Sequence, residues 1–289
     1  MRNIYITFGG RAYDETTGAL FEILRDGHGV DDVQVYDDKW LVDHQDLNGN
    51  GYRSVNSWLW ETPRKFGFGW CAWKPYIIID ALSRLRNGDV VFYVDADCVP
   101  IADLSIVFDI ARRDGLMLFD CQGFTNSMMT RHDCLMAMGL DKPEIANAKA
   151  ACARFCAFRK GSFLAQQILM EWYTYSINPL CQQWGFGDWT KRQPGDVHSV
   201  YTQEYPDFFR HSTEQSVLAA LASKYNVQLY REACQFGCWD KPPDVDYYNK
   251  YNVIHDAYPQ LFEQQDARGP RALEGSRFRN VSHINLEFA

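Results

Sequence analysis

The segment that most constrains the fold is the apolar run Val-Val-Phe-Tyr-Val at residues 90–94, which leads directly into Asp-Ala-Asp at 95–97. A run of five apolar residues without polar alternation is typical of a strand buried on both faces, as in a parallel sheet covered by helices. A helical pattern over residues 73–85, with a proline in its first turn, precedes the run. A helix, a buried strand and a polar pair in this order predict an α/β architecture.

Strands and helices alternate on both sides of this segment. Further strands are predicted at residues 3–8, 33–36, 116–119, 152–158 and 227–230, and further helices at 16–25, 162–177 and 213–225. This alternation predicts a Rossmann-like fold with a mostly parallel central sheet and helices on both faces, in which ligands bind at the carboxyl ends of the strands. We expect residues 1–233 to form this domain and residues 234–289 to form a C-terminal extension packed on it.

Charge and composition exclude several functional classes. The chain has 289 residues and a formal net charge of -8, without the basic stripe that nucleic-acid binding requires. No apolar run is long enough for a transmembrane segment, and the first residues enter a strand pattern rather than a signal peptide. The nine cysteines are odd in number and lack the spacing of a zinc site. We therefore expect reduced thiols and a cytoplasmic location, with peripheral attachment at the inner face of a membrane left open.

The Asp-Ala-Asp tripeptide carries the candidate chemistry. Because side chains alternate along an extended chain, Asp95 and Asp97 are expected to project to the same side. Two neighbouring carboxylates repel each other unless a cation lies between them, and their oxygens suit Mg²⁺ or Mn²⁺. A diphosphate bound to such an ion is a stabilised leaving group. The tripeptide also occurs in many surface loops, but the buried strand before it favours a metal site.

Several motifs together resemble the GT-A glycosyltransferases. The run Gly-Phe-Gly-Trp-Cys-Ala-Trp-Lys-Pro-Tyr at 67–76, followed by the Asp-Ala-Asp tripeptide, is similar to bacterial enzymes of lipopolysaccharide O-antigen and capsule assembly. It is more distantly similar to the glycogenin-like group. Further elements of these enzymes resemble residues 130–133, 154–160 and 211–218. The resemblance covers about residues 1–230, and it implies a GT-A fold.

The resemblance also implies how the nucleotide-sugar donor is bound. The residues implied to contact the donor are Thr7, Phe8, Gly9, Lys74, Asp95, Ala96 and Asp97. Lys74 would contact the diphosphate or orient an aspartate by a salt bridge. An ordinary surface lysine is the alternative for this position.

Metal ligands and catalytic residues follow from the same resemblance. Asp95 and Asp97 would hold Mn²⁺ or Mg²⁺, with His283 as a third ligand and His255 as the other candidate histidine. Asp97 and Glu214 would be the catalytic residues, although the family has Asp where this chain has Glu214. A histidine with a purely structural role remains open, and so does a Glu214 that only stabilises the start of its helix.

These features predict a metal-dependent, hexosyltransferase-like glycosyltransferase of polysaccharide biosynthesis. The expected partners are a nucleotide-sugar donor, with UDP as its nucleotide, and a saccharide or lipid-linked saccharide acceptor. Similarity of the Glu214-Gln215 segment to the retaining enzymes favours retention of configuration. Two alternatives remain open: a non-catalytic carbohydrate-binding protein, suggested by the aromatic-rich stretch 182–209, and a metal-dependent hydrolase or phosphotransferase.

Overall fold

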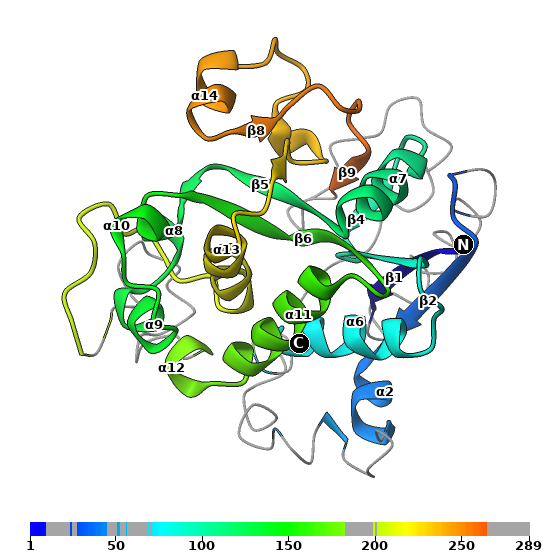
Figure 1. Cartoon of the computed structure of the whole chain (residues 1–289), viewed down its shortest axis with the longest axis horizontal. Helices are drawn as coiled ribbons and strands as arrows, with labels where there is room; N and C mark the ends of the chain where they lie inside the picture. The colour runs from blue at the N-terminus through cyan, green and yellow to red at the C-terminus, as the bar shows by residue number, and fades with distance from the viewer. Residues whose placement is uncertain are drawn as a thin grey trace, which may run out of the picture.

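A seven-stranded sheet forms the centre of the molecule (Figure 1). The computed structural model describes residues 1–9, 24, 28–44, 51–52, 56, 69, 71–182, 199 and 201–264. The order of the strands in the sheet is β2-β1-β3-β6-β5-β7-β8. Their bounds are β1 Asn3–Phe8, β2 Asp32–Tyr36, β3 Val90–Val94, β5 Leu116–Thr125, β6 Lys149–Arg159, β7 Leu229–Tyr230 and β8 Val253–Ile254.

The sheet is mostly parallel, as the sequence predicts. The pairs β1–β2, β1–β3, β5–β7 and β7–β8 are parallel. Strand β6 is the exception, because it runs antiparallel to both β3 and β5. Helices cover both faces of β6, so apolar side chains point to both faces of the strand. Such a pattern does not show in which direction the strand runs.

Helices pack on the two faces of the sheet in separate layers (Figure 1). On one face, α6 (Trp73–Ser83), α11 (Phe163–Ser176) and α13 (Glu214–Lys224) pack against alternate residues of the strands, such as Ile4 and Ile6. On the other face, α7 (Ser105–Asp114) and the residues around Phe262 pack against the intervening ones, such as Tyr5. The alternation of side chains along each strand thus builds two cores.

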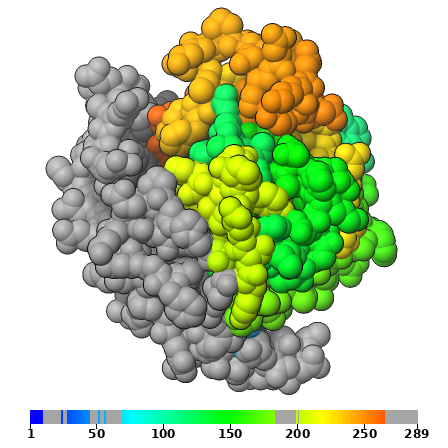
Figure 2. Space-filling view, turned by 90° about the vertical axis from the view of Figure 1, so that its left-hand side faces the viewer, coloured from blue at the N-terminus to red at the C-terminus, as the bar shows by residue number. Residues whose placement is uncertain are grey.

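Shorter elements complete the described part of the chain. They are α2 Asp38–Asp43, α8 Asn126–Met129, α9 His132–Ala137, α10 Pro143–Ala146, α12 Pro179–Gln182, the 3-10 turn η4 Gln235–Gly237, α14 Val245–Lys250 and a two-stranded antiparallel sheet of β4 Cys98–Pro100 and β9 Phe262–Gln264. The segment that starts at residue 201 (yellow-green) lies against the green residues of the α8–α10 region, with the orange α14 region above them (Figure 2).

Most predicted elements in the described part are present. Strand β5 extends to residue 125, beyond the predicted end at 119, and pairs with β6 across register shifts that interrupt its pattern. The predicted helix at 16–25 falls almost wholly outside the described residues. None of the helices in the described ranges has the length and hydrophobicity of a membrane span.

Candidate functional site

The Asp-Ala-Asp tripeptide forms the turn that follows β3. All five residues of β3 are buried, and the strand lies between β1 and β6, so the turn is fixed at the carboxyl end of the sheet's centre. The Asp95 N–H donates to the Arg154 carbonyl at 3.0 Å, and the Cys98 N–H donates to the Asp95 carbonyl at 3.0 Å. These bonds hold the backbone on both sides of Asp95, whose side chain remains 33% exposed.

Lys74 forms ion pairs with two of the candidate carboxylates, those of Asp95 and Glu214. Its Nζ lies 3.0 Å from an Asp95 carboxylate oxygen and 3.2 Å from one of Glu214. It also donates to the Ala153 carbonyl at 3.2 Å. The side chain is 4% exposed, so the surface-lysine alternative is wrong. Burial lowers the pKa of Lys74, but Asp95 and Glu214 outweigh it, so the pKa is raised and the ammonium stays charged.

Glu214 is the first residue of α13, and its carboxylate turns into the protein. Besides Lys74, it accepts a hydrogen bond from the Thr213 hydroxyl at 2.8 Å. Thr213 has φ 49°, a left-handed conformation that costs about 1–3 kcal/mol outside glycine. Burial raises the pKa of Glu214, and Lys74 offsets part of that rise. The carboxylate is therefore held by an ion pair, which a role confined to the helix start would not require.

Asp97, the residue before β4, accepts two hydrogen bonds from side chains. The Gln264 amide donates to one carboxylate oxygen at 2.6 Å, and the Cys98 thiol lies 3.4 Å from the other. Burial and the charge of Asp95 raise the pKa of Asp97, while Gln264 and Arg154 lower it. The two aspartates thus repel each other in a partly desolvated place, and a bound cation would relieve this repulsion.

The residues at this turn fit a Mg²⁺ or Mn²⁺ ion. In proteins such ions are often held by one or two carboxylates together with waters and substrate phosphates. Across the described residues, no group of three or more His, Cys, Asp or Glu side chains is placed to hold a metal. The described residues therefore do not supply a complete set of protein ligands. An ion that Asp95 and Asp97 share with a diphosphate fits these two carboxylates better.

The structure does not bring His255 to the aspartates. His255 follows β8 and stacks on Tyr248, with 5.0 Å between the ring centroids. β8 is the fourth strand from β3 in the sheet, which is a separation of roughly 19 Å at the usual strand spacing. His283, the predicted third metal ligand, lies outside the described residues.

The end of β1 lies next to this turn, because β1 and β3 are parallel neighbours. The Thr7 hydroxyl is buried and has no hydrogen-bond partner among the described residues. The Phe8 ring stacks on Trp73, with 3.8 Å between the ring centroids. An unpaired buried hydroxyl is costly, so a ligand that bonds to Thr7 would be stabilised there. Thr7, Phe8 and Gly9 therefore lie beside the Asp-Ala-Asp turn, and their contacts with a donor stay a prediction.

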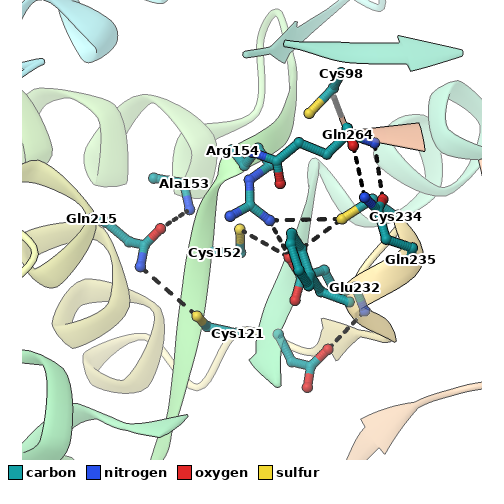
Figure 3. Close-up of polar contacts among 12 residues, drawn as sticks. Cys98, Cys121, Cys152, Ala153, Arg154, Gln215, Glu232, Cys234, Gln235 and Gln264 are labelled. Carbon is teal, nitrogen blue, oxygen red and sulfur yellow. Dashed lines mark hydrogen bonds and ion pairs between the residues drawn. The ribbon is translucent and has the colours of Figure 1, made fainter. Parts of the chain in front are cut away.

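Further polar residues without an expected role lie near the turn, in β6, after β7 and at the start of α13 (Figure 3). Arg154 of β6 pairs with Glu232, which follows β7. Gln215 accepts from the Ala153 N–H at 3.2 Å. Two sequence signals point to Arg154: it begins the segment 154–160 that resembles the glycosyltransferases, and it is a charged residue within the apolar run 152–158. No such signal marks Glu232, because only the strand order brings it to β6.

The motifs at 130–133 and 211–218 contact each other and position α13. The Arg131 N–H donates to His211 Nδ1 at 3.3 Å, and His211 Nε2 donates to the Cys181 carbonyl at 2.7 Å. Burial and the charge of Arg131 lower the pKa of His211 to about 3, so the imidazole is neutral. These buried bonds fix the chain three residues before Glu214.

His132 fastens the segment after residue 201 to α9 and makes the attachment sensitive to pH. Its Nε2 lies 2.9 Å from an Asp141 oxygen, and its Nδ1 donates to the Gln203 carbonyl at 2.7 Å. Burial lowers the pKa of His132, but the Gln203 bond and Asp141 outweigh it, so the pKa is raised above 6.5. The resulting stabilisation is complete below the unfolded-state pKa and is lost as the pH rises through the raised value.

We expect His132→Gln to lower the free energy of unfolding by up to about 1 kcal/mol at about pH 6, and by much less at about pH 9. Denaturant unfolding of the variant and the unmodified protein at the two pH values measures the difference. A loss of the same size at both values would contradict the ion pair with Asp141.

Comparison with known proteins gives only weak similarities. The sequence matches no protein family and no curated protein. Mouse xyloside xylosyltransferase 1 in its apo form has a TM-score of 0.44 at 10% identity, covering 93% of this chain and 87% of that one. The apo bifunctional glycosyltransferase WbbM has a TM-score of 0.42 at 10% identity, with 90% of this chain covered but only 46% of that one.

The galactosyltransferase LgtC, in complex with donor and acceptor sugar analogues, has a TM-score of 0.43 at 12% identity. The match covers 90% of this chain and 86% of that one. All three TM-scores lie below 0.5. Similarity at this level does not assign a function to this chain.

Proposed function

We propose that the chain is a metal-dependent glycosyltransferase of the GT-A type, which transfers a sugar from a nucleotide-sugar donor to a saccharide or lipid-linked saccharide acceptor. The observation that carries the proposal is the carboxylate pair Asp95 and Asp97 at the end of the buried strand β3. Asp95 and Asp97 would hold a divalent ion, which would supply positive charge to stabilise a departing diphosphate. We propose UDP as the nucleotide, Mn²⁺ as the ion and polysaccharide biosynthesis as the setting.

The chain's own residues bind and orient the donor in this proposal. Thr7, Phe8, Gly9 and Ala96, at the neighbouring ends of β1 and β3, line the side on which the nucleoside binds. Lys74 is buried against Asp95, which supports an orienting role over direct contact with the diphosphate. Its ammonium group pairs with the Asp95 carboxylate at 3.0 Å and thereby holds that side chain in place.

Glu214 is the candidate catalytic carboxylate beside the sugar that is transferred. Its carboxylate shares Lys74 with Asp95, so it lies beside the donor side of the site. Its raised pKa, caused first by burial, suits a group that holds or accepts a proton. The Glu-Gln pair at the start of α13 supports transfer with retention of configuration.

Calorimetric titration of UDP, GDP and TDP, with and without Mn²⁺, tests the proposal. We expect one nucleotide, UDP, to bind only when Mn²⁺ is present. Absence of binding by all three under both conditions would overturn the proposal and leave the carbohydrate-binding alternative.

We expect Glu214→Gln to lower kcat about 100-fold while the KM for the donor stays within about threefold, because the change removes a charge and a proton acceptor without altering size. Release of UDP from the UDP-sugar that proves to be the donor measures both constants. Glu171→Gln is the matched control, because Glu171 pairs with Lys224 on the surface. An unchanged kcat in Glu214→Gln would remove Glu214 from the reaction.

A further inference from the structure

An exposed aromatic ring lies beside the ion pair of Arg154 and Glu232. Phe236, in the turn η4, is 51% exposed. The guanidinium of Arg154 lies over the ring, 5.3 Å from its centroid. A cation covers one side of the ring, and the exposed remainder is open to a ligand.

The turn that carries Phe236 is rigidly held. A Cβ atom added to Gly237 would lie 2.4 Å from the Glu232 carbonyl oxygen, so the turn packs closely against the chain that follows β7. The Gln235 side chain donates to the Gln264 carbonyl at 2.7 Å and accepts from the Gln264 N–H at 2.9 Å. Since Gln264 also bonds to Asp97, the ring is tied to the aspartate pair through a short chain of contacts.

Arg154 presents hydrogen-bond donors at the same place. Its Nη1 pairs with the Glu232 carboxylate and lies 3.7 Å from the Cys234 sulfur, and Figure 3 shows the arginine and the glutamate pointing toward each other. Among the described residues, its Nε and Nη2 have no hydrogen-bond partner. The arginine side chain is 23% exposed, whereas Glu232 is 4% exposed. A fixed guanidinium with free N–H groups therefore faces the site.

We propose that Phe236 and Arg154 form a subsite for an uncharged pyranose ring of the substrate. The C–H face of a pyranose packs on an aromatic ring, and the guanidinium donates to its hydroxyls. Glu232 already neutralises Arg154, so the pair offers no net positive charge to a charged sugar. A carboxylate or phosphate on this sugar would lie beside the Glu232 carboxylate without a free cation to bind it, so a neutral sugar fits. The subsite deepens the proposed function, on which it rests.

Saturation-transfer NMR with glucose, galactose, N-acetylglucosamine and glucuronate tests the subsite. We expect at least one neutral sugar to bind, glucuronate to bind more weakly, and Phe236→Ala to weaken the neutral sugar roughly three- to tenfold. Phe236→Trp should retain the affinity. Phe163→Ala is the matched control, because Phe163 is also exposed (80%) but lies elsewhere. It begins α11, near the residues that precede β3, whereas the Asp-Ala-Asp turn follows β3.

A titration with nucleotide sugars shows whether the pyranose bound at this subsite belongs to the donor or to the acceptor. Weaker binding of UDP-glucose or UDP-galactose to Phe236→Ala in Mn²⁺, with UDP unchanged, assigns the sugar to the donor. Unchanged nucleotide-sugar binding with weaker binding of the free sugar assigns it to the acceptor. Any of three results would overturn the subsite. Phe236→Ala and the unmodified protein could bind every sugar ligand equally, no sugar could bind at all, or glucuronate could bind more tightly than the neutral sugars. Metal-dependent UDP binding decides the proposed function separately, because it does not involve Phe236.

Discussion

Lys74→Met is expected to lower the free energy of unfolding by about 3–5 kcal/mol, because it leaves a buried carboxylate without its cation. The Lys74 ammonium lies 3.2 Å from Glu214, and both side chains are less than 10% exposed. Methionine has a similar length and suits a helix, so the packing of α6 changes little. Denaturant unfolding near neutral pH measures the loss.

A second variant separates charge from packing. Lys74→Met combined with Glu214→Gln removes both charges, and we expect it to recover most of the lost stability. The loss in Lys74→Met should also shrink as the pH falls, because protonation makes Glu214 neutral and burial already raises its pKa.

Lys224→Met is the matched control for this ion pair. The Lys224 ammonium lies 2.7 Å from Glu171, but the side chains are 33% and 26% exposed, so we expect a loss below about 1 kcal/mol. Losses of equal size in Lys74→Met and Lys224→Met would contradict the explanation by a buried charge.

The parts of the fold that the sequence predicts are those in which local pattern and burial agree. Strand β3 occupies residues 90–94, as predicted, because a short apolar run bounded by a turn and a carboxylate pair has few other solutions. Helix α6 begins at Trp73 as expected, with proline where a missing N–H is tolerated. The turn with Asp95 and Asp97 follows from these two elements.

The remaining features of the site depend on contacts between distant segments. The direction of β6 decides that Arg154 meets Glu232, residues 78 positions apart in the sequence. The orientation of Lys74 depends on α13, which supplies Glu214 from a segment far along the chain. Gln264 reaches Asp97 only because β9 pairs with β4. Spacing and periodicity carry no information on such pairings, so they predict the Asp-Ala-Asp turn at the end of β3 but not that Arg154, Glu232 and Gln264 lie beside it.

Asp97→Ala is expected to lower the rate of sugar transfer roughly 10³-fold, because an ion that stabilises a leaving diphosphate contributes several kcal/mol. The unfolding temperature of the ligand-free variant should be equal to or higher than that of the unmodified protein. Burial and the charge of Asp95 raise the pKa of Asp97, which means that its ionised form is unfavourable in the fold without a cation. A loss of activity without a loss of stability would separate function from folding.

Thermal unfolding with Mn²⁺ and UDP provides the second measurement. Ligands that bind only the folded state raise its stability in proportion to the logarithm of their concentration over Kd. We expect this rise in the unmodified protein and in Asp109→Ala, whose side chain is 69% exposed on α7. Asp97→Ala should show no rise, because a single carboxylate remains at the turn. An equal rise in Asp97→Ala would contradict a metal site at this turn and would require the nucleotide to bind elsewhere on the sheet.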